Sequence, residues 1–182
     1  MSNSTENPKL HPFSYVVLAL IGESGAGAHD LVRMMRQGRV YWAASESHYY
    51  AEPKRLERLG LLRSEKRPGV TTQRTHYMLT ERGREALVQW LGEPAAFTRI
   101  QSEAIVKVLA SDLTDDASVA ASIAALRAQI DELEAGVAAG EEMIPDLPHR
   151  ARNLRLVHRY GRAMLDLHRQ WVDEVERELG GS

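Results

Sequence analysis

The fold is decided by residues 45–79, which read SESHYYAEPKRLERLGLLRSEKRPGVTTQRTHYML. The first part, residues 45–59, predicts a helix, because polar residues surround a few apolar ones at helical spacing. After Gly60 the apolar residues no longer follow helical spacing. Residues 61–65 and 75–79 instead predict two short strands joined by a turn-rich loop. A helix followed directly by a β-hairpin is typical of a winged helix.

Further helices are predicted on both sides of this stretch. Pro12 suits the first position of an apolar helix over residues 13–22, and residues 29–37 predict an amphipathic helix. After the hairpin, residues 81–91 predict a fourth helix, which Thr80 caps. Three helices followed by a two-stranded hairpin is the order of a winged helix-turn-helix.

The second half of the chain predicts helices only, so the fold class is mainly α. We expect a disordered leader over residues 1–10, the winged helix over residues 11–93 and a helical C-terminal domain over residues 97–180. In the last of these, Thr98 with Gln101 forms a capping box for a helix that reaches about Leu113.

The next predicted helix carries a coiled-coil seam, in which apolar residues alternate at intervals of four and three. The seam consists of Val119, Ile123, Leu126, Ile130, Leu133 and Val137. The last helix, over residues 149–179, has an apolar stripe too broad for one partner helix, so we expect long helices that pair two subunits. The residues expected at this homodimer contact are Ile123, Leu126, Ile130, Leu133, Leu154, Val157, Met164, Trp171 and Val175. A three-helix bundle within one chain is the alternative.

Charge divides the chain in the same way. Residues 29–90 hold 12 Lys and Arg against 7 Asp and Glu, whereas residues 91–182 hold 10 against 16. A cationic module followed by an anionic one favours a polyanionic partner for the first module.

Double-stranded DNA is the polyanion that a helix of this size fits, because its major groove admits an α-helix. On the helix over residues 45–59, the candidate DNA-binding residues are Ser45, Ser47, His48, Tyr50, Lys54 and Arg55. In the hairpin loop they are Lys66, Arg67 and Arg74. Ser45 can also cap the helix, while Pro53 either bends it or marks the start of its regular part.

Several motifs resemble the signature of PadR-type transcriptional regulators. They are Tyr41-Trp42, Ser45-x-Ser47-x-x-Tyr50, Lys54-Arg55-Leu56-Glu57-x-x-Gly60-Leu61 and Tyr77-x-Leu79-Thr80-x-x-Gly83-Arg84. The tail from Ser102 to Trp171 resembles the helical C-terminal domain of the virulence-activator-like branch of that family.

This resemblance covers nearly the whole chain past residue 12. It implies a winged-helix DNA-binding domain, homodimerisation through the C-terminal helices and, usually, repression. It also implies that Tyr50, Lys54 and Arg55 face DNA. The family commonly has proline directly after that tyrosine, where this chain has Ala51 and places the proline at Pro53.

The sequence predicts no enzyme, no cofactor and no metal site. The chain has no cysteine and its histidines lack zinc-like spacing, while the glycine-rich residues 22–27 lack the lysine of a phosphate loop. We expect a cytoplasmic protein that does not enter the membrane.

A small apolar or aromatic effector is a further expected partner, in a pocket between the two domains that Trp42, Trp90, Tyr160 and Trp171 could line. The alternative function is a winged-helix module for protein or small-molecule binding that has lost DNA binding.

Overall fold

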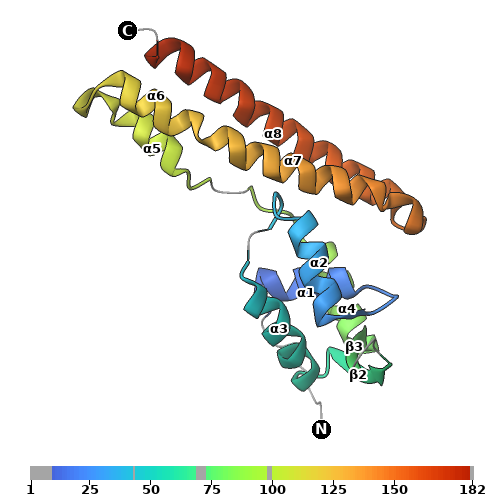
Figure 1. Cartoon of the computed structure of the whole chain (residues 1–182). Coiled ribbons are helices and arrows are strands. Elements are labelled where there is room, and N and C mark those ends of the chain that lie inside the picture. The colour runs from blue at the N-terminus through green and yellow to red at the C-terminus, as the bar shows by residue number, and fades with distance from the viewer. Residues whose placement is uncertain (1–9, 43, 69–72, 98–99, 181–182) are drawn as a thin grey trace. The chain divides into compact units, whose positions relative to one another are not determined.

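A computed structural model describes residues 10–42, 44–68, 73–97 and 100–180 of the chain (Figure 1). The chain divides into two units. The N-terminal unit comprises Met1–Arg36 and Ala43–Ala96, and the C-terminal unit comprises Gln37–Trp42 and Phe97–Ser182. Apart from Leu10, the predicted leader lies outside the described residues.

The helices of the winged-helix region form in the expected order. They are α1 (Pro12–Ile21), α2 (Ala28–Gln37), α3 (Glu46–Arg58) and α4 (Glu81–Leu91). Pro12 occupies the first turn of α1, as predicted. The prediction of a cap at Thr80 is also confirmed, because its hydroxyl accepts the N–H of Gly83 at 3.0 Å.

Helix α3 differs from the prediction at Ser45, and it removes one of the two alternatives for Pro53. Ser45 stands at the N-cap position, but its side chain caps no backbone N–H; its hydroxyl instead contacts the Ser47 hydroxyl and Nδ1 of His48. Pro53 lies inside the helix and is buried, so the alternative in which the regular helix begins at this proline is wrong.

The hairpin forms a three-stranded sheet with one strand that the sequence did not predict. The strands β1 (Ala26–Gly27), β2 (Leu62–Arg67) and β3 (Arg74–Leu79) are antiparallel in the order β1-β3-β2. Gly25, just before β1, has φ +72°, and a Cβ there would lie 2.7 Å from the carbonyl oxygen of Tyr77. Glycine therefore lets the loop approach β3 closely enough to pair with it.

The core of the N-terminal unit gathers apolar side chains from α1, α2, α3 and the sheet. Its most buried members include Val17, Leu18, Ile21, Leu31, Tyr49, Leu56, Leu61 and Tyr77. Because α3 gives one side to this core, its opposite side is left at the surface beside the hairpin.

The C-terminal unit is helical, as predicted, with different boundaries. Its helices are α5 (Glu103–Leu109), α6 (Asp116–Ala124), α7 (Leu126–Glu142) and α8 (Ala151–Leu179), with 3-10 turns at Ser111–Leu113 and Ile144–Asp146. The predicted helix start at Thr98 lies outside the described residues. Ser102 caps α5 by accepting the N–H of Ile105, and α5 ends before Leu113. The expected single seam helix is divided at Ala125.

The seam packs against α8 of the same chain. The buried cluster comprises Val119, Ile123, Ile130, Val137, Leu165, Val172 and Val175, with Leu126, Leu133 and Trp171 packed against it. Ile123, Ile130 and Val175, expected at a contact between subunits, are thus core residues of one chain. Leu154 and Met164 are half-buried, whereas Val157 is 44% exposed.

Residues 37–42 join α2 to α3 in the chain, yet they belong to the C-terminal unit. Val40 packs against the C-terminal core, and Arg39 forms an ion pair with Glu132 on α7 at 2.9 Å. Neither contact was predicted. In the part of the chain that the structure describes, no helix is both long and apolar enough to span a bilayer.

Candidate nucleic-acid interface

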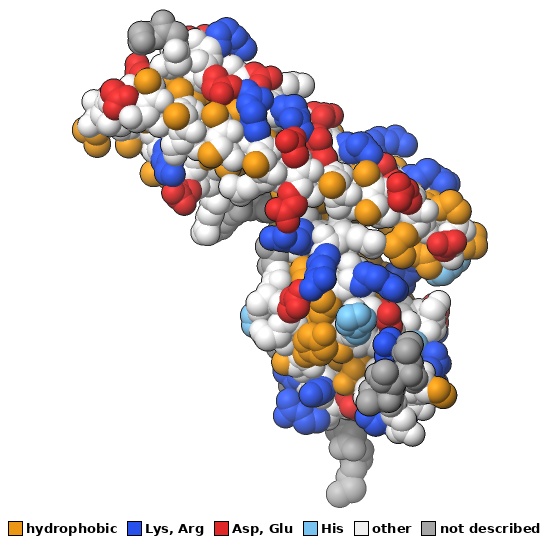
Figure 2. Space-filling model, in the orientation of Figure 1, with side chains coloured by type: hydrophobic (Ala, Val, Ile, Leu, Met, Phe, Trp, Pro, Cys, Tyr) orange, Lys and Arg blue, Asp and Glu red, His pale blue; other side chains and the backbone are white. Residues whose placement is uncertain are grey.

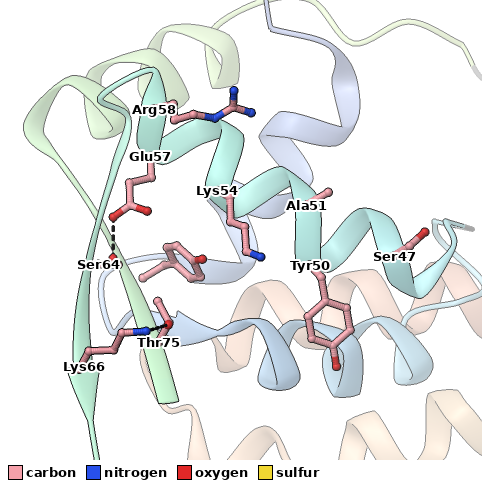
Figure 3. A pocket seen from close by; sticks show the side chains of 10 residues that line it. Ser47, Tyr50, Ala51, Lys54, Glu57, Arg58, Ser64, Lys66 and Thr75 are labelled. Carbon is pink, nitrogen blue, oxygen red and sulfur yellow. Dashed lines mark hydrogen bonds between the residues drawn. The ribbon is translucent and has the colours of Figure 1, made fainter. Parts of the chain in front are cut away.

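A cleft of about 910 Å³ separates α3 from the hairpin formed by β2 and β3 (Figure 3). It is lined by Ser47, Tyr50, Ala51, Lys54, Glu57, Arg58, Ser64, Lys66, Thr75 and Tyr77. The lining residues of α3 recur at intervals of three and four, so they share one face of the helix. Predicted DNA-binding residues from the helix and from the hairpin therefore meet across one cleft.

The helix face combines uncharged donors with cations. Ser47 and Lys54 are exposed, and Tyr50 is 43% exposed although it is a large aromatic residue. Ala51, which also lines the cleft, adds little side-chain bulk to this face. These are the chemical groups that bind phosphates and base edges in DNA complexes.

The hairpin supplies the other three predicted residues. Lys66 Nζ donates to the Thr75 hydroxyl at 2.7 Å, which holds the ammonium beside the cleft. Arg67 pairs with Glu65 two residues before it, and this hydrogen bond holds the pKa of that carboxyl below its usual value. Arg67 and Arg74 line a second hollow of about 520 Å³, which Tyr50 and Lys54 share with the first.

Two residues that line these hollows were not among the predicted DNA-binding residues. Arg58 lines the first cleft, and its position four residues after Lys54 and eight after Tyr50 could have placed it on the same helix face. His29, at the start of α2, lines the second hollow. It lies in the first turn of that helix, where backbone N–H groups favour an anion.

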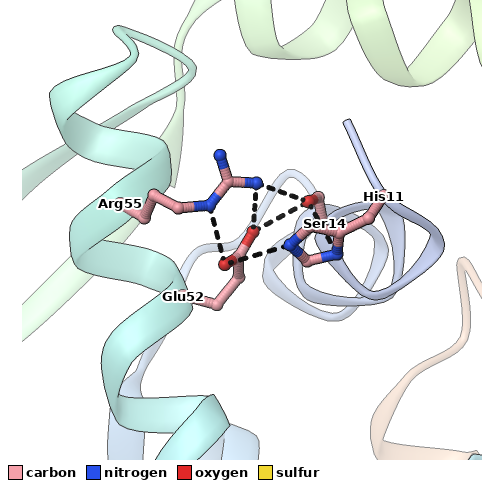
Figure 4. A network of polar contacts seen from close by, with 4 residues as sticks. All are labelled: His11, Ser14, Glu52 and Arg55. Atoms are coloured by element: carbon pink, nitrogen blue, oxygen red, sulfur yellow. Dashed lines mark hydrogen bonds and ion pairs between the residues drawn. The ribbon is translucent and has the colours of Figure 1, made fainter. Parts of the chain in front are cut away.

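Arg55 does not line either hollow. Its guanidinium donates to both carboxylate oxygens of Glu52, at 3.0 and 3.1 Å, and to the hydroxyl of Ser14 on α1 at 3.0 Å (Figure 4). Ser14 also donates to Glu52 at 2.8 Å, and Nε2 of His11 lies 3.6 Å from the same carboxylate. The family resemblance implied that Arg55 faces DNA; in the structure it ties α3 to α1.

Glu52 and Ser14 are buried, so this network lies largely out of water. A buried carboxylate requires a cation and hydrogen-bond donors to offset its lost hydration. Arg55 supplies the charge and Ser14 supplies a further donor. The network thus fixes α3 on α1, while Lys54, the residue just before Arg55, remains exposed.

The remaining predicted helix residues lie at the start of α3. Ser45 and His48 are both exposed, and they contact each other at 3.1 Å. The His48 ring also lies near Phe13, with 5.9 Å between the ring centroids. Lys and Arg side chains are visible around the end of the N-terminal unit that carries α3 and the hairpin (Figure 2).

The four aromatic residues expected around an effector are placed differently from one another. Trp90 stacks on Tyr15 in the N-terminal unit, with 4.6 Å between the ring centroids. Trp42 and Tyr160 are 36% and 64% exposed. Trp171 lines a cavity of about 680 Å³ within the C-terminal unit, between α5, the α6–α7 junction and α8.

Comparisons with known proteins agree with the resemblance seen in the sequence. Residues 100–180 match the family described as Virulence activator alpha C-term. Bacillus subtilis PadR, solved in complex with operator DNA, is similar in fold, with a TM-score of 0.72 and 18% identity over 93% of this chain and 98% of that chain. The Vibrio cholerae virulence activator AphA gives a TM-score of 0.67 and 24% identity over 92% and 97%.

A second structure of Bacillus subtilis PadR, in complex with p-coumaric acid, gives a TM-score of 0.61 and 16% identity over 90% of this chain and 98% of that chain. No curated protein matches the chain. The matched family and folds are those of regulators, in agreement with the prediction that the chain is not an enzyme.

Proposed function

We propose that this chain, which has the PadR fold and a C-terminal domain of the virulence activator alpha type, is a homodimeric transcriptional repressor that binds duplex DNA. The observation that carries the proposal is the cleft between α3 and the hairpin, where Tyr50, Lys54 and Arg58 on the helix meet Lys66 on β2. Helix α3 is the reading helix, and the hairpin is the wing.

The dimensions of α3 suit the major groove. Its 13 residues make a helix about 20 Å long at 1.5 Å per residue. The groove is about 12 Å wide, which admits a helix together with its side chains. With Lys54 and Arg58 one turn apart, the helix can hold phosphates on one strand while Ser47 and Tyr50 reach base edges.

The wing extends the positively charged surface away from α3. Lys66, Arg67 and Arg74 lie on paired strands, where Arg67 and Arg74 face each other in the register. Each phosphate that such a side chain neutralises releases bound counterions, so affinity should fall steeply with salt. Bacillus subtilis PadR, which shares the fold, has been solved on operator DNA, and this supports the same role here.

A homodimer would place two reading helices on one duplex. Recognition helices of paired winged helices enter successive major grooves about 34 Å apart, so the operator would be a pseudo-palindrome. Exposed apolar side chains in the C-terminal unit support pairing, since monomers rarely leave such surfaces uncovered. They include Ile105, Val106, Leu109, Leu156, Tyr160 and Leu167.

The direct experiment measures binding to a random-sequence 30-base-pair duplex over a salt titration. We expect tight binding at low salt and loss of affinity as salt rises. The Lys54→Ala and Lys66→Ala variants should each flatten the slope of log K against log salt by about 0.9. Arg152→Ala, an exposed cation on α8, is the matched control and should bind like the parent.

If the parent chain fails to bind DNA at low salt, the DNA-binding proposal is wrong. The alternative is then a winged-helix module that binds a protein or a small molecule and has lost DNA binding. Parent-like salt slopes in both lysine variants would instead show that DNA is bound by another surface.

A small effector is the second part of the proposed regulation. The cavity beside Trp171 is lined by apolar residues such as Ile130, Leu133 and Met164, with Gln129 and His168 at polar positions. Its volume, about 680 Å³, lies in the range of pockets that hold small ligands. An apolar or aromatic molecule should quench or shift Trp171 fluorescence, and Trp171→Phe should remove that signal.

A further inference from the structure

Glu57 places a negative charge within the positively charged cleft between α3 and the hairpin. It follows Lys54 by three residues and precedes Arg58 on α3, and Lys66 lines the same cleft from β2. The three cations attract DNA phosphates, whereas the carboxylate of Glu57 repels them. Its place in this cleft therefore requires a role other than phosphate binding.

The partners of Glu57 differ from those of the neighbouring acidic residues. Glu52 forms an ion pair with Arg55, and Glu65 forms one with Arg67. In the part of the chain that the structure describes, no Lys or Arg forms an ion pair with Glu57, which is half-buried. Because no cation contacts this carboxylate directly, its charge acts on whatever enters the cleft.

One hydrogen bond fixes the direction of the Glu57 carboxylate. The Ser64 hydroxyl on β2 donates to Oε1 of Glu57 at 2.5 Å (Figure 3). Among the described residues no donor reaches the second oxygen, Oε2. Glu57 thus offers a free acceptor whose position is set by the reading helix and by the wing together.

We propose that Glu57 is a specificity-determining residue that selects cytosine in the bound DNA. The inference rests on the proposed DNA-binding function and deepens it. In the major groove cytosine presents its N4 amino group, which donates a hydrogen bond, and no acceptor. Guanine and thymine present acceptors there, and adenine carries the N7 acceptor beside its amino group. A carboxylate therefore favours cytosine over the other three bases.

The same carboxylate weakens binding that depends on phosphates alone. At a site without a base donor for Oε2, Glu57 brings an unpaired negative charge against a polyanion. Specificity is a difference between two affinities, and it grows when the wrong site is penalised as well as when the right one is favoured. Glu57 would act in both ways.

The test selects duplexes for the full chain from a random-sequence library and compares Glu57→Gln with the parent. Glutamine has a similar shape and can still accept from Ser64, but its amide is neutral and suits adenine. We expect a motif with one fixed position that is cytosine in the parent and adenine in the variant, with the other positions unchanged. The parent should favour cytosine there by about tenfold or more.

A second measurement uses a random-sequence duplex of about 30 base pairs, the length of some three helical turns. Glu57→Gln should bind it about threefold or more tightly than the parent, because a repulsive charge has been removed. Glu85→Gln, which removes an exposed carboxylate from α4 outside the cleft, is the matched control and should bind like the parent.

Ser64→Ala tests the hydrogen bond that directs the carboxylate. Ser64 is exposed, so this variant should keep the parent's melting temperature. It retains the charge of Glu57 but no longer fixes its direction. We expect a weaker preference for cytosine and an unchanged affinity for the random duplex. A cytosine preference equal to that of the parent would reject Ser64 as the positioning residue.

The outcomes separate this inference from the function on which it rests. A cytosine preference that survives in Glu57→Gln, or a parent motif without such a position, would overturn the role of Glu57 while leaving DNA binding intact. Equal gains in random-duplex affinity in Glu57→Gln and Glu85→Gln would assign the effect to net charge and overturn it as well. A parent chain that binds no duplex at low salt would instead reject DNA binding itself.

Discussion

The hydroxyl of Tyr41 is hydrogen-bonded to Nδ1 of His158, 3.1 Å away, although 116 residues separate the two in the sequence. Glycines on two helices make room for this pair. A Cβ at Gly140 on α7 would lie 2.7 Å from the His158 ring, and one at Gly161 on α8 would lie 2.5 Å from the Tyr41 oxygen. These contacts of Tyr41 anchor the segment between α2 and α3 in the C-terminal unit.

The first prediction concerns the packing of Tyr41 against Gly161. Gly161→Ala should lower the free energy of unfolding by about 1–3 kcal/mol, because the added methyl overlaps the Tyr41 ring. Urea denaturation followed by circular dichroism measures the change. Gly136→Ala, also inside a helix of this unit, gains helix propensity and should not destabilise the chain. Equal stability of the Gly161 variant and the parent would contradict the packing described.

The second prediction concerns pH. Burial lowers the pKa of His158, against the nearby Glu141, which raises it. The folded chain therefore favours neutral His158, and the unfolded chain binds the proton more readily. Stability should be fully present above the ordinary histidine pKa of about 6.5 and should be lost as pH falls below it. Denaturation between pH 7.5 and 5 should show that the free energy of unfolding falls less steeply in His158→Gln than in the parent chain. Identical slopes in the two proteins would contradict this role of His158.

The third prediction concerns the network on α3. Glu52→Ala should destabilise the fold by about 2–4 kcal/mol, because it leaves buried Ser14 and the Arg55 guanidinium without their acceptor. Thermal unfolding measures the loss, with the exposed Glu85→Ala as control. Arg55→Ala should lower both the melting temperature and DNA affinity. An unchanged melting temperature in Arg55→Ala would instead favour a direct role at DNA.

The fourth prediction concerns a residue that the sequence did not suggest. Arg58→Ala should weaken binding to random duplex DNA and reduce its salt slope by about 0.9, with no change in melting temperature. Arg63→Ala is the matched control, because side chains alternate along β2 and Arg63 points away from the face that carries Ser64 and Lys66. Equal losses in both variants would show that net charge, and not the cleft, governs affinity.

Local signals in the sequence were enough to predict the winged-helix order and much of the DNA-binding face. Proline at the start of α1, the Thr80 cap and the period change after Gly60 act within a few residues, so they can be interpreted without the fold. The same reasoning placed Tyr50, Lys54 and Lys66 in one module. It missed β1, because two residues that pair with a distant strand carry no periodic pattern of their own.

Only the tertiary structure decided which partner each residue takes. Arg55 resembles Lys54 as a surface cation in the sequence, yet the buried Glu52 and Ser14 draw its guanidinium toward α1. The coiled-coil seam predicts that α6 and α7 pair with a helix, and the fold shows that this helix is α8 of the same chain. Hydrophobic burial and ion pairing depend on proximity in space, and residues far apart in the sequence become neighbours only when the chain has folded.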